Sequence, residues 1–313
     1  MLKLEHISKI YKTGTFGGKE LRAVNDISFT IEDGEVLSLI GESGSGKSTI
    51  GKMILRLIST TNGQINLDGK DIQEYQDKEY YRKVQGVFQD PFSCFNPIFK
   101  ADRVFKIIHE EFYPHISDQE WQEKTAQTLK SVGLNPEHVI DKYPHQLSGG
   151  QLQRFLIARA LLLDIKFLVA DEIISMLDAS TRIDVLNLLA ELKASGLSIL
   201  FITHDLSLAN YISERAIILY RGCTAEVGTI DNVFNHPLHP YTQMLIASVP
   251  RLDKEWDREA TTVEQCLTDR ASTTGCVYAD RCPHVFDLCK QTPPILEVEP
   301  GHSASCWLYN KNG

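Results

Sequence analysis

The sequence has no long apolar run. A helix that crosses a membrane needs about 20 consecutive, mostly apolar residues. The most apolar segments, residues 167–170 and 198–203, are short, rich in β-forming residues and bounded by polar side chains. The opening, MLKLEHISKIYK, interleaves charged with apolar residues and lacks the continuous apolar core of a secretory signal. We therefore expect the chain to act at a membrane only through partners.

Positive charge is also scarce. The chain has 32 Lys and Arg residues against 41 Asp and Glu residues, which gives a formal net charge of −9. Nucleic-acid binding depends on basic side chains that neutralise phosphates and release counterions, so a nucleic acid is not an expected partner. The 313 residues exceed the common size of one domain. We expect one large core and an appendage.

The apolar pattern changes along the chain. Alternation at residues 2–7 and 23–31 predicts antiparallel strands, and residues 35–40, 166–171 and 198–203 read as buried strands. Helical spacing at 49–58, 151–163 and 180–195 separates these strands, which predicts a parallel α/β sheet. Residues 91–146 are mainly helical and suggest an inserted subdomain. Beyond residue 250 the chain turns polar, irregular and rich in cysteine, so we expect a domain boundary there.

The segment GESGSGKS at residues 41–48 matches the phosphate-binding pattern G-x-x-x-x-G-K-[ST]. Its glycines let backbone N–H groups crowd around phosphate oxygens, while Lys47 reaches the outer phosphates and the Ser48 hydroxyl coordinates Mg²⁺. A glycine-rich turn with a chance lysine is the alternative, but the position between a strand and a helix favours ATP binding. The candidate ATP-binding residues here are Gly41, Glu42, Ser43, Gly44, Ser45, Gly46, Lys47, Ser48 and Thr49.

A phosphate-binding loop needs a second, acidic element to hold the metal, and the apolar strand at 167–170 ends in two carboxylates. Asp171 is placed to hold Mg²⁺ and Glu172 to polarise the attacking water. Two solvated acids at a strand end are the alternative. The loop at 41–48 favours the catalytic interpretation.

The order of these motifs resembles the ATP-binding subunit of ABC transporters over residues 1–250. The resemblance rests on residues 41–49, Gln89, LSGGQLQR at 147–154, the Asp171-Glu172 pair, SMLD at 175–178 and His204. It implies an α/β fold, namely a P-loop NTPase ABC ATPase core with an antiparallel β subdomain. It also implies an inserted helical subdomain at about 91–150 and a small C-terminal cysteine-rich regulatory or metal-binding domain at 251–313.

The resemblance assigns roles by position. The signature segment at 147–151 would open a helix N-terminus that meets the γ-phosphate of ATP held by an opposite subunit. Tyr11 would stack on adenine, although a core tyrosine is the alternative. The implied signature residues are Leu147, Ser148, Gly149, Gly150 and Gln151, and the implied D-loop residues are Ser175 and Asp178. The implied catalytic residues are Glu172, His204, Gln89 and Lys47, and the implied Mg²⁺ ligands are Ser48, Gln89 and Asp171.

One pair of residues departs from the family pattern. Ile173 and Ile174 stand where many members have Pro-Thr or Pro-Val, which suggests a slightly shifted loop after Glu172. The two carboxylates themselves are intact. We therefore expect the chain to hydrolyse ATP.

Three further segments resemble the ATPases of oligopeptide, dipeptide and nickel importers: FQDPFSCFNP at 88–97, NHPLHPYTQ at 235–243 and GCVYADRCP at 275–283. Residues 51–57 and 61–65 look like the second, F-type ATPase of the pair. The implied partners are a D-type ATPase in a heterodimer, two transmembrane permease subunits and an extracytoplasmic substrate-binding protein, at the cytoplasmic face of the membrane. The implied cargo is oligopeptides or related small solutes, with oligosaccharides as another option.

Cysteine is concentrated near the end of the chain, where Cys276, Cys282, Cys289 and Cys306 follow Cys266. Four thiolates suit a tetrahedral zinc or a cubane iron–sulfur cluster, and the spacing lacks the C-x-x-C pairs of common zinc ribbons. Resemblance to the importer branch favours a [4Fe–4S] cluster on the last four cysteines. Zinc and no metal remain the alternatives, and Cys266 is expected to be a spare thiol.

Two other functions fit the same ATP-binding motifs. One is a soluble, non-transport ABC ATPase that acts on ribosomes or nucleic acid, but such proteins usually carry two cassettes or a long coiled-coil insertion. The other is a module that binds ATP without turnover. A single cassette with a short helical insertion favours the transporter.

Overall fold

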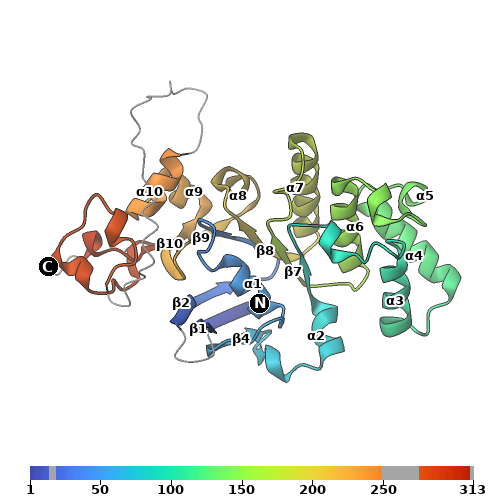
Figure 1. Ribbon diagram of the computed structural model, residues 1–313, viewed down its shortest axis with the longest axis horizontal. Coiled ribbons are helices and arrows are strands. Elements are labelled where there is room, and N and C mark those ends of the chain that lie inside the picture. The colour runs from blue at the N-terminus through green and yellow to red at the C-terminus, as the bar shows by residue number, and fades with distance from the viewer. Residues whose placement is uncertain (14–18, 249–274, 311–313) are drawn as a thin grey trace.

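The computed structural model describes residues 1–13, 19–248 and 275–310. The molecule is elongated, with the helices α3, α4 and α5 gathered at one end and the C-terminal segment, residues 275–310, at the other (Figure 1). Two sheets lie between these ends. The ATP-binding motifs of the sequence fall in this middle part.

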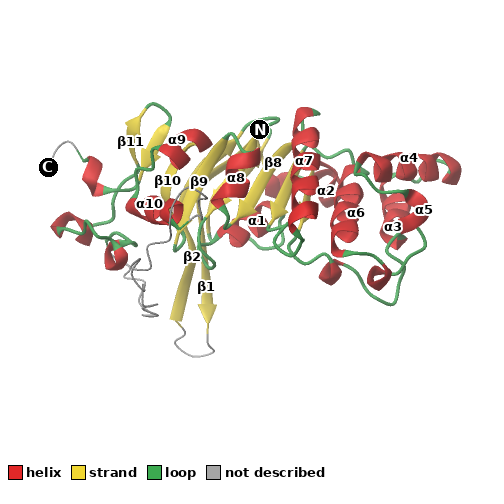
Figure 2. Ribbon diagram, turned by 90° about the horizontal axis from the view of Figure 1, so that it is seen from above, coloured by secondary structure: helices red, strands yellow, loops and turns green. Residues whose placement is uncertain are grey.

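The smaller sheet is antiparallel, as the alternation at the start of the chain predicted. Its strands are β1 (Leu2–Thr13), β2 (Lys19–Ile31), β4 (Asn62–Leu67) and β5 (Lys70–Asp71), in the order β2-β1-β4-β5. The buried side chains of these strands face the larger sheet across helix α1 (Lys47–Ile54). The β1–β2 hairpin projects beyond the larger sheet (Figure 2).

The larger sheet has eight strands in the order β11-β12-β10-β9-β3-β8-β7-β6. Strands β9, β3, β8, β7 and β6 are parallel, whereas β10, β12 and β11 add antiparallel at one edge. The bounds are β3 (Val36–Ile40), β6 (Val84–Val87), β7 (Phe167–Asp171), β8 (Ser198–Thr203), β9 (Arg215–Tyr220), β10 (Cys223–Thr229), β11 (Leu296–Glu299) and β12 (His302–Ala304). The predicted parallel α/β sheet is therefore present.

Both faces of this sheet are buried, which explains why its central strands are continuously apolar. In β8, Leu200 and Ile202 pack with α1 and the small sheet, whereas Ile199 and Phe201 pack on the opposite face. Helices α6 (Gly149–Leu161) and α7 (Ala179–Ala194) cover that second face. Successive side chains of a strand point to opposite faces of the sheet. Strand β8 therefore packs into both hydrophobic cores and holds the sheet between its two layers of helices.

The predicted helical insertion consists of α3 (Arg103–Phe112), α4 (Asp118–Ser131) and the short α5 (Pro136–Val139). Helix α4 begins at a capping box, in which Ser117 accepts a hydrogen bond from the Glu120 N–H and Glu120 accepts one from the Ser117 N–H. The other helices are α2 (Asp77–Lys83), α8 (Leu206–Ile212), α9 (Ile230–Asn235) and α10 (Pro240–Ala247).

The C-terminal segment extends the sheet of the core, because β12 pairs with β10 and β11 pairs with β12. A buried pair of side chains stabilises the contact between β12 and β10. The His302 Nε2 atom lies 2.7 Å from the Glu226 Oε1 atom, and both side chains are fully buried. The Glu226 carboxylate also accepts backbone hydrogen bonds from Leu238 and His239. The predicted boundary at 250/251 and Cys266 lie outside the described residues.

Within the described residues, every helix is too short or too polar to span a bilayer.

Candidate functional site

The predicted site residues follow the carboxyl ends of four neighbouring parallel strands. Strand β3 leads into the P-loop (residues 41–48), β8 leads to His204, β7 ends at Asp171, and β6 precedes Gln89. The strands are in register at this edge, with Ile40 opposite Thr203 and Asp171 opposite Ile202. Parallel α/β sheets bind ligands at this edge. Sheet topology thus brings together segments that are far apart in the sequence.

The P-loop contains a position that only glycine can occupy. Gly46 has a φ of 102°, and a Cβ atom there would lie 2.4 Å from the backbone oxygen of Ala23 on β2. Any side chain would push the loop away from β2, because the left-handed conformation and the contact both exclude it. Helix α1 starts directly afterwards at Lys47. The loop therefore presents its backbone N–H groups at a helix N-terminus, where anions bind.

The Lys47 ammonium is held by the backbone of its own loop. The Lys47 ammonium donates to the carbonyl oxygens of Gly41, at 2.7 Å, and Glu42, at 2.9 Å. Burial lowers the pKa of Lys47, while the carboxylates of Glu172, Asp171 and Glu42 act in the opposite direction. The buried ammonium is thus surrounded by groups that favour its charged form.

Ser48 and Asp171 are in direct contact, since the Ser48 hydroxyl donates to the Asp171 carboxylate at 3.1 Å. Burial raises the pKa of Asp171, whereas this hydrogen bond and Lys47 lower it. Hydroxyl and carboxylate oxygens are the donors that Mg²⁺ prefers. The oxygen donors of this pair therefore fit the magnesium ion that the resemblance implies.

Glu172 lies beside His204. The His204 Nδ1 atom is 3.4 Å from one carboxylate oxygen of Glu172, and the Ser175 hydroxyl donates to the other at 3.4 Å. Glu172 has a φ of 50°, which is uncommon for a residue with a side chain and is typical of strained functional positions. The side chains of Ile173 and Ile174 are both buried in the core that also contains Leu177. Both isoleucines thus anchor the turn after Glu172.

Gln89 and Tyr11 lie on elements that border this site. Gln89 follows β6, whose last residue Val87 pairs with Ala170, the neighbour of Asp171. Tyr11 is half-buried on β1 and pairs with Leu21 on β2, the strand that also contacts Gly46. The roles that the resemblance implies for Gln89 and Tyr11 stay predictions.

The signature segment opens helix α6. Ser148 and Gln151 form a capping box at its start. The Ser148 hydroxyl accepts a hydrogen bond from the Gln151 N–H at 3.2 Å, and the Gln151 side-chain oxygen accepts one from the Ser148 N–H at 2.9 Å. A Cβ atom at Gly150 would lie 2.4 Å from the Thr181 methyl group, so the start of α6 packs tightly on the start of α7. There, Asp178 caps α7, and hydrogen bonds from Thr181 and Ser180 lower the pKa of its carboxyl group to about 2. The signature and D-loop segments are thus adjacent.

The four C-terminal cysteines are free thiols. Burial raises the pKa of Cys276, Cys282 and Cys306, in the last case to about 11, and the neighbouring thiols act in the same direction on Cys306. Across residues 1–13, 19–248 and 275–310, no group of three or more His, Cys, Asp or Glu side chains could hold a metal ion. The described residues therefore give no support to the predicted cluster, although Cys276, Cys282 and Cys289 lie close enough to Cys306 to influence its pKa.

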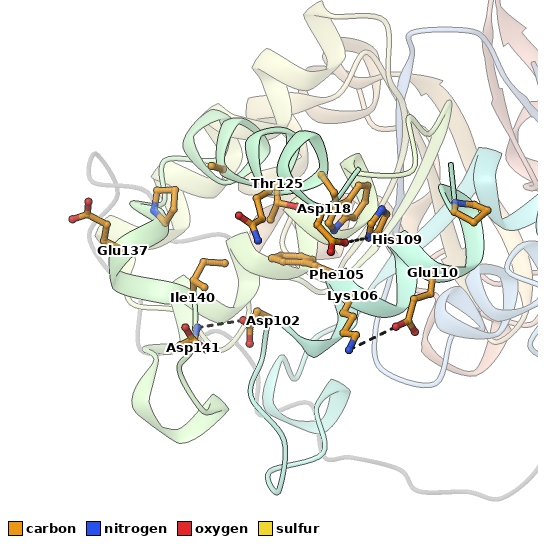
Figure 3. A pocket seen from close by; sticks show the side chains of 15 residues that line it. Asp102, Phe105, Lys106, His109, Glu110, Asp118, Thr125, Glu137, Ile140 and Asp141 are labelled. Carbon is orange, nitrogen blue, oxygen red and sulfur yellow. Dashed lines mark hydrogen bonds and ion pairs between the residues drawn. The ribbon is translucent and has the colours of Figure 1, made fainter. Parts of the chain in front are cut away.

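A cavity of about 940 Å³ lies among α3, α4 and α5 (Figure 3). These helices are at the end of the molecule opposite the C-terminal segment (Figure 1). Its inner wall is aromatic, with His109 stacked on Trp121 at 5.0 Å between ring centroids. The hydroxyl of Thr125 also lines it, buried and unpaired within the described part of the chain. Its acidic lining residues are Asp102, Glu110, Asp118, Glu137 and Asp141. Lys106 also lines the cavity and lies 3.8 Å from Glu110. The cavity is therefore apolar inside and lined by more acidic than basic side chains.

Two contacts of the P-loop were not predicted. The Tyr241 hydroxyl accepts a hydrogen bond from the Glu42 N–H at 2.9 Å, and Arg281 contacts the Glu42 carboxylate. Both residues belong to segments that the sequence singled out, 235–243 and 275–283, as marks of one importer branch. The only signal of a role was that resemblance, because no local pattern relates either residue to position 42.

Comparisons with known proteins identify the family of the chain. A family model described as ABC transporter matches residues 24–175, and one described as Oligopeptide/dipeptide transporter, C-terminal region, matches residues 225–289. The chain is 38% identical to the Oligopeptide transport ATP-binding protein OppF of Escherichia coli over 92% of this chain and 88% of that protein. It is 39% identical to the Oligopeptide transport ATP-binding protein AppF of Bacillus subtilis over 99% of this chain and 98% of that protein.

Solved structures resemble the same region. The post-hydrolysis dimer of the ATP-binding cassette MJ0796 bound to ADP and Pi has a TM-score of 0.65 and 31% identity, covering 74% of this chain and 99% of that one. The protein cbiO1 from Clostridium perfringens, part of the ABC transporter complex cbiONQ, has a TM-score of 0.64 and 26% identity. That match covers 75% of this chain and 90% of the other.

Proposed function

The chain belongs to the ATP-binding subunits of ABC transporters, in the oligopeptide and dipeptide branch, and from this membership we propose how it powers peptide import. One observation carries the proposal: the P-loop, Asp171, Glu172 and His204 meet at the carboxyl edge of one parallel sheet. ATP would lie along this edge, with its phosphates on the P-loop and its adenine on Tyr11.

Each side chain has a distinct task in this proposal. Lys47 neutralises the outer phosphates, Glu172 orients the attacking water and takes its proton, and His204 holds the Glu172 carboxylate in place. Ser48, Asp171 and Gln89 would hold Mg²⁺, which when bound neutralises charge on the transferred phosphoryl group. These residues form only half of a site.

The other half would come from a second ATPase. We propose that Ser148, Gly149 and Gly150 at the N-terminus of α6 complete the ATP site of a partner, while the partner's signature segment completes this one. Helix N-termini stabilise negative charge, and the Ser175 and Asp178 loop lies beside this surface. The partner is a D-type ATPase, so that the pair is a heterodimer. Closure around two ATP molecules would then switch the permease.

The cavity among α3, α4 and α5 is the proposed docking site for the permease. Its apolar interior and its acidic side chains suit a cytoplasmic segment of the permease that carries an apolar residue next to basic ones. Docking there would place the chain at the cytoplasmic face of the membrane. The two permease subunits and an extracytoplasmic binding protein complete the complex, whose cargo is oligopeptides or, as a second candidate class, oligosaccharides.

Reconstitution of the complex tests this function. Liposomes that contain both ATPases and the permease should take up oligopeptide when the loaded binding protein and ATP are present. We expect Lys47→Ala to reduce uptake at least tenfold, because removal of a preorganised charge at reacting phosphates typically costs about 10²-fold or more. Lys130→Ala, which removes an exposed lysine in the last turn of α4, should leave uptake unchanged.

Two outcomes would contradict the proposal. Uptake that is insensitive to Lys47→Ala would show that hydrolysis at this site is not coupled to transport. ATP turnover that responds to ribosomes or nucleic acid, and not to the loaded binding protein, would identify the soluble non-transport ABC ATPase instead.

The cysteine spacing and the resemblance to the importer branch are the support for a [4Fe–4S] cluster, or zinc, on Cys276, Cys282, Cys289 and Cys306. The thiols do not fit the group as they lie, so no step of ATP hydrolysis depends on it here. Protein purified without oxygen should show a broad visible absorption band that bleaches on reduction if a cluster forms. A colourless protein with one equivalent of zinc would favour the alternative, and a colourless, metal-free protein would refute both.

A further inference from the structure

The C-terminal segment reaches back to the P-loop through one side chain. Arg281 lies in η4 (Ala279–Arg281), and its Nη1 atom is 3.1 Å and 3.0 Å from the two carboxylate oxygens of Glu42. These residues are 239 positions apart in the sequence. Glu42 is the second residue of the P-loop. A segment outside the ATPase core thus contacts the loop expected to bind phosphate.

Glu42 is held on its backbone as well. Its N–H donates to the hydroxyl of Tyr241, a fully buried side chain at the start of α10. The two branch-typical segments, 235–243 and 275–283, therefore meet at a single P-loop residue. Segment 235–243 contacts the backbone of Glu42 through Tyr241, and segment 275–283 contacts its side chain through Arg281.

Three tyrosines, Tyr220, Tyr241 and Tyr278, position Arg281. Their ring centroids are 4.6 Å to 5.5 Å apart. The Arg281 guanidinium lies 5.8 Å from the Tyr220 ring and 5.9 Å from the Tyr278 ring, and it donates to the Tyr220 hydroxyl at 3.4 Å. Because the tyrosine cluster is largely buried, it limits the directions in which the guanidinium can point. Arg281 is thereby aimed at the P-loop.

The charges explain why this contact matters for ATP. Glu42 puts a carboxylate on a loop that must receive a triphosphate, and it lies close enough to influence the pKa of Lys47. An unpaired carboxylate there would repel the phosphates and compete for the Lys47 ammonium. A guanidinium is always charged in a protein, and the contacts of Arg281 with both carboxylate oxygens therefore neutralise Glu42. The Glu42–Arg281 pair beside the phosphate site would then have a net charge of zero.

We propose that Arg281 is a positioning residue for ATP, which acts through Glu42 to set the affinity of the P-loop for the nucleotide. The inference rests on the proposed binding of ATP at residues 41–48. It gives the C-terminal segment a part in nucleotide binding that requires no metal. Arg281 touches no reacting atom, so its effect should appear in the KM for ATP and not in kcat.

Steady-state ATP hydrolysis by the assembled complex tests this inference with Arg281→Gln, Glu42→Gln and the double variant. We expect Arg281→Gln to raise the KM for ATP roughly fivefold, because a partly exposed ion pair contributes on the order of 1 kcal/mol. kcat should stay within about twofold. In the Glu42→Gln background the same arginine change should have little effect, since the charge to be neutralised is gone. Arg281→Lys should restore most of the affinity.

Controls separate this role from a structural one. Lys290→Gln removes an exposed cation from the same C-terminal segment, 2.8 Å from Asp287, and should change neither KM nor kcat. A lower melting temperature of Arg281→Gln with an unchanged KM would show that the contact only anchors the segment. An equal KM effect with and without Glu42 would also overturn the inference. If the wild-type complex binds no ATP, the proposed function itself fails, which is a separate result.

Discussion

Glutamine in place of Glu172 should stop ATP turnover by the assembled complex while ATP binding persists. The substitution keeps the size of the side chain but removes the group that takes a proton from water, and loss of a general base typically costs about 10²- to 10⁴-fold. The phosphate contacts of the P-loop do not depend on this carboxylate. The measurements are single-turnover hydrolysis and retention of labelled ATP after gel filtration.

The matched control for this prediction is Glu191→Gln. Glu191 lies on α7 and is exposed, so the same chemical change there should leave turnover as in the wild type. His204→Ala should give an intermediate loss, because it frees the Glu172 carboxylate without removing it. Unchanged turnover of Glu172→Gln would exclude this residue as the base.

The largest effect on stability is expected from Glu226→Ala. The fully buried carboxylate accepts hydrogen bonds from His302 and from the backbone of Leu238 and His239. Its loss leaves three buried donors unpaired, and breaking such a network costs about 3–5 kcal/mol. We expect the melting temperature to fall by roughly 10 °C. Thermal unfolding and hydrogen exchange at Leu238 and His239 would measure the change.

Two further variants define the source of this stability. Glu226→Gln keeps the shape and one acceptor, so it should lose less than Glu226→Ala. Glu299→Gln alters a carboxylate that is 59% exposed and 4.0 Å from the other nitrogen of His302, and it should stay within about 0.5 kcal/mol of the wild type. Equal stability of Glu226→Ala and the wild type would refute a role for the buried pair.

Local patterns made most of the core predictable. The P-loop and the helix start at Ser148 are defined by residues within a few positions of each other, so the sequence displays both directly. Strands β7 and β8 are apolar on both faces because both faces are covered, and their limits differ from those predicted by at most one residue. Helix α1 is shorter than predicted and ends at Ile54, because the apolar spacing continues into the turn that follows.

Long-range pairings were not predictable in the same way. The contacts of Glu42 with Tyr241 and Arg281 depend on how α10 and η4 fold back onto the core, and nothing near either residue encodes the partner. The pairing of β12 with β10 is equally non-local. The cysteine spacing did predict that the thiols gather, but spacing alone does not determine whether four sulfur atoms face one point.

The pairing of β12 with β10 also has a consequence for synthesis. The ribosome releases β10 long before β12, so the nascent core carries an unpaired sheet edge until the last part of the chain emerges. Exposed edges of this kind are templates for association with other chains. A truncated chain that ends before His302 would leave β10 unpaired at the sheet edge and would lack the hydrogen-bond partner of the buried Glu226. Interrupted synthesis should therefore yield aggregates, even though every residue of the P-loop and of the signature segment is already present.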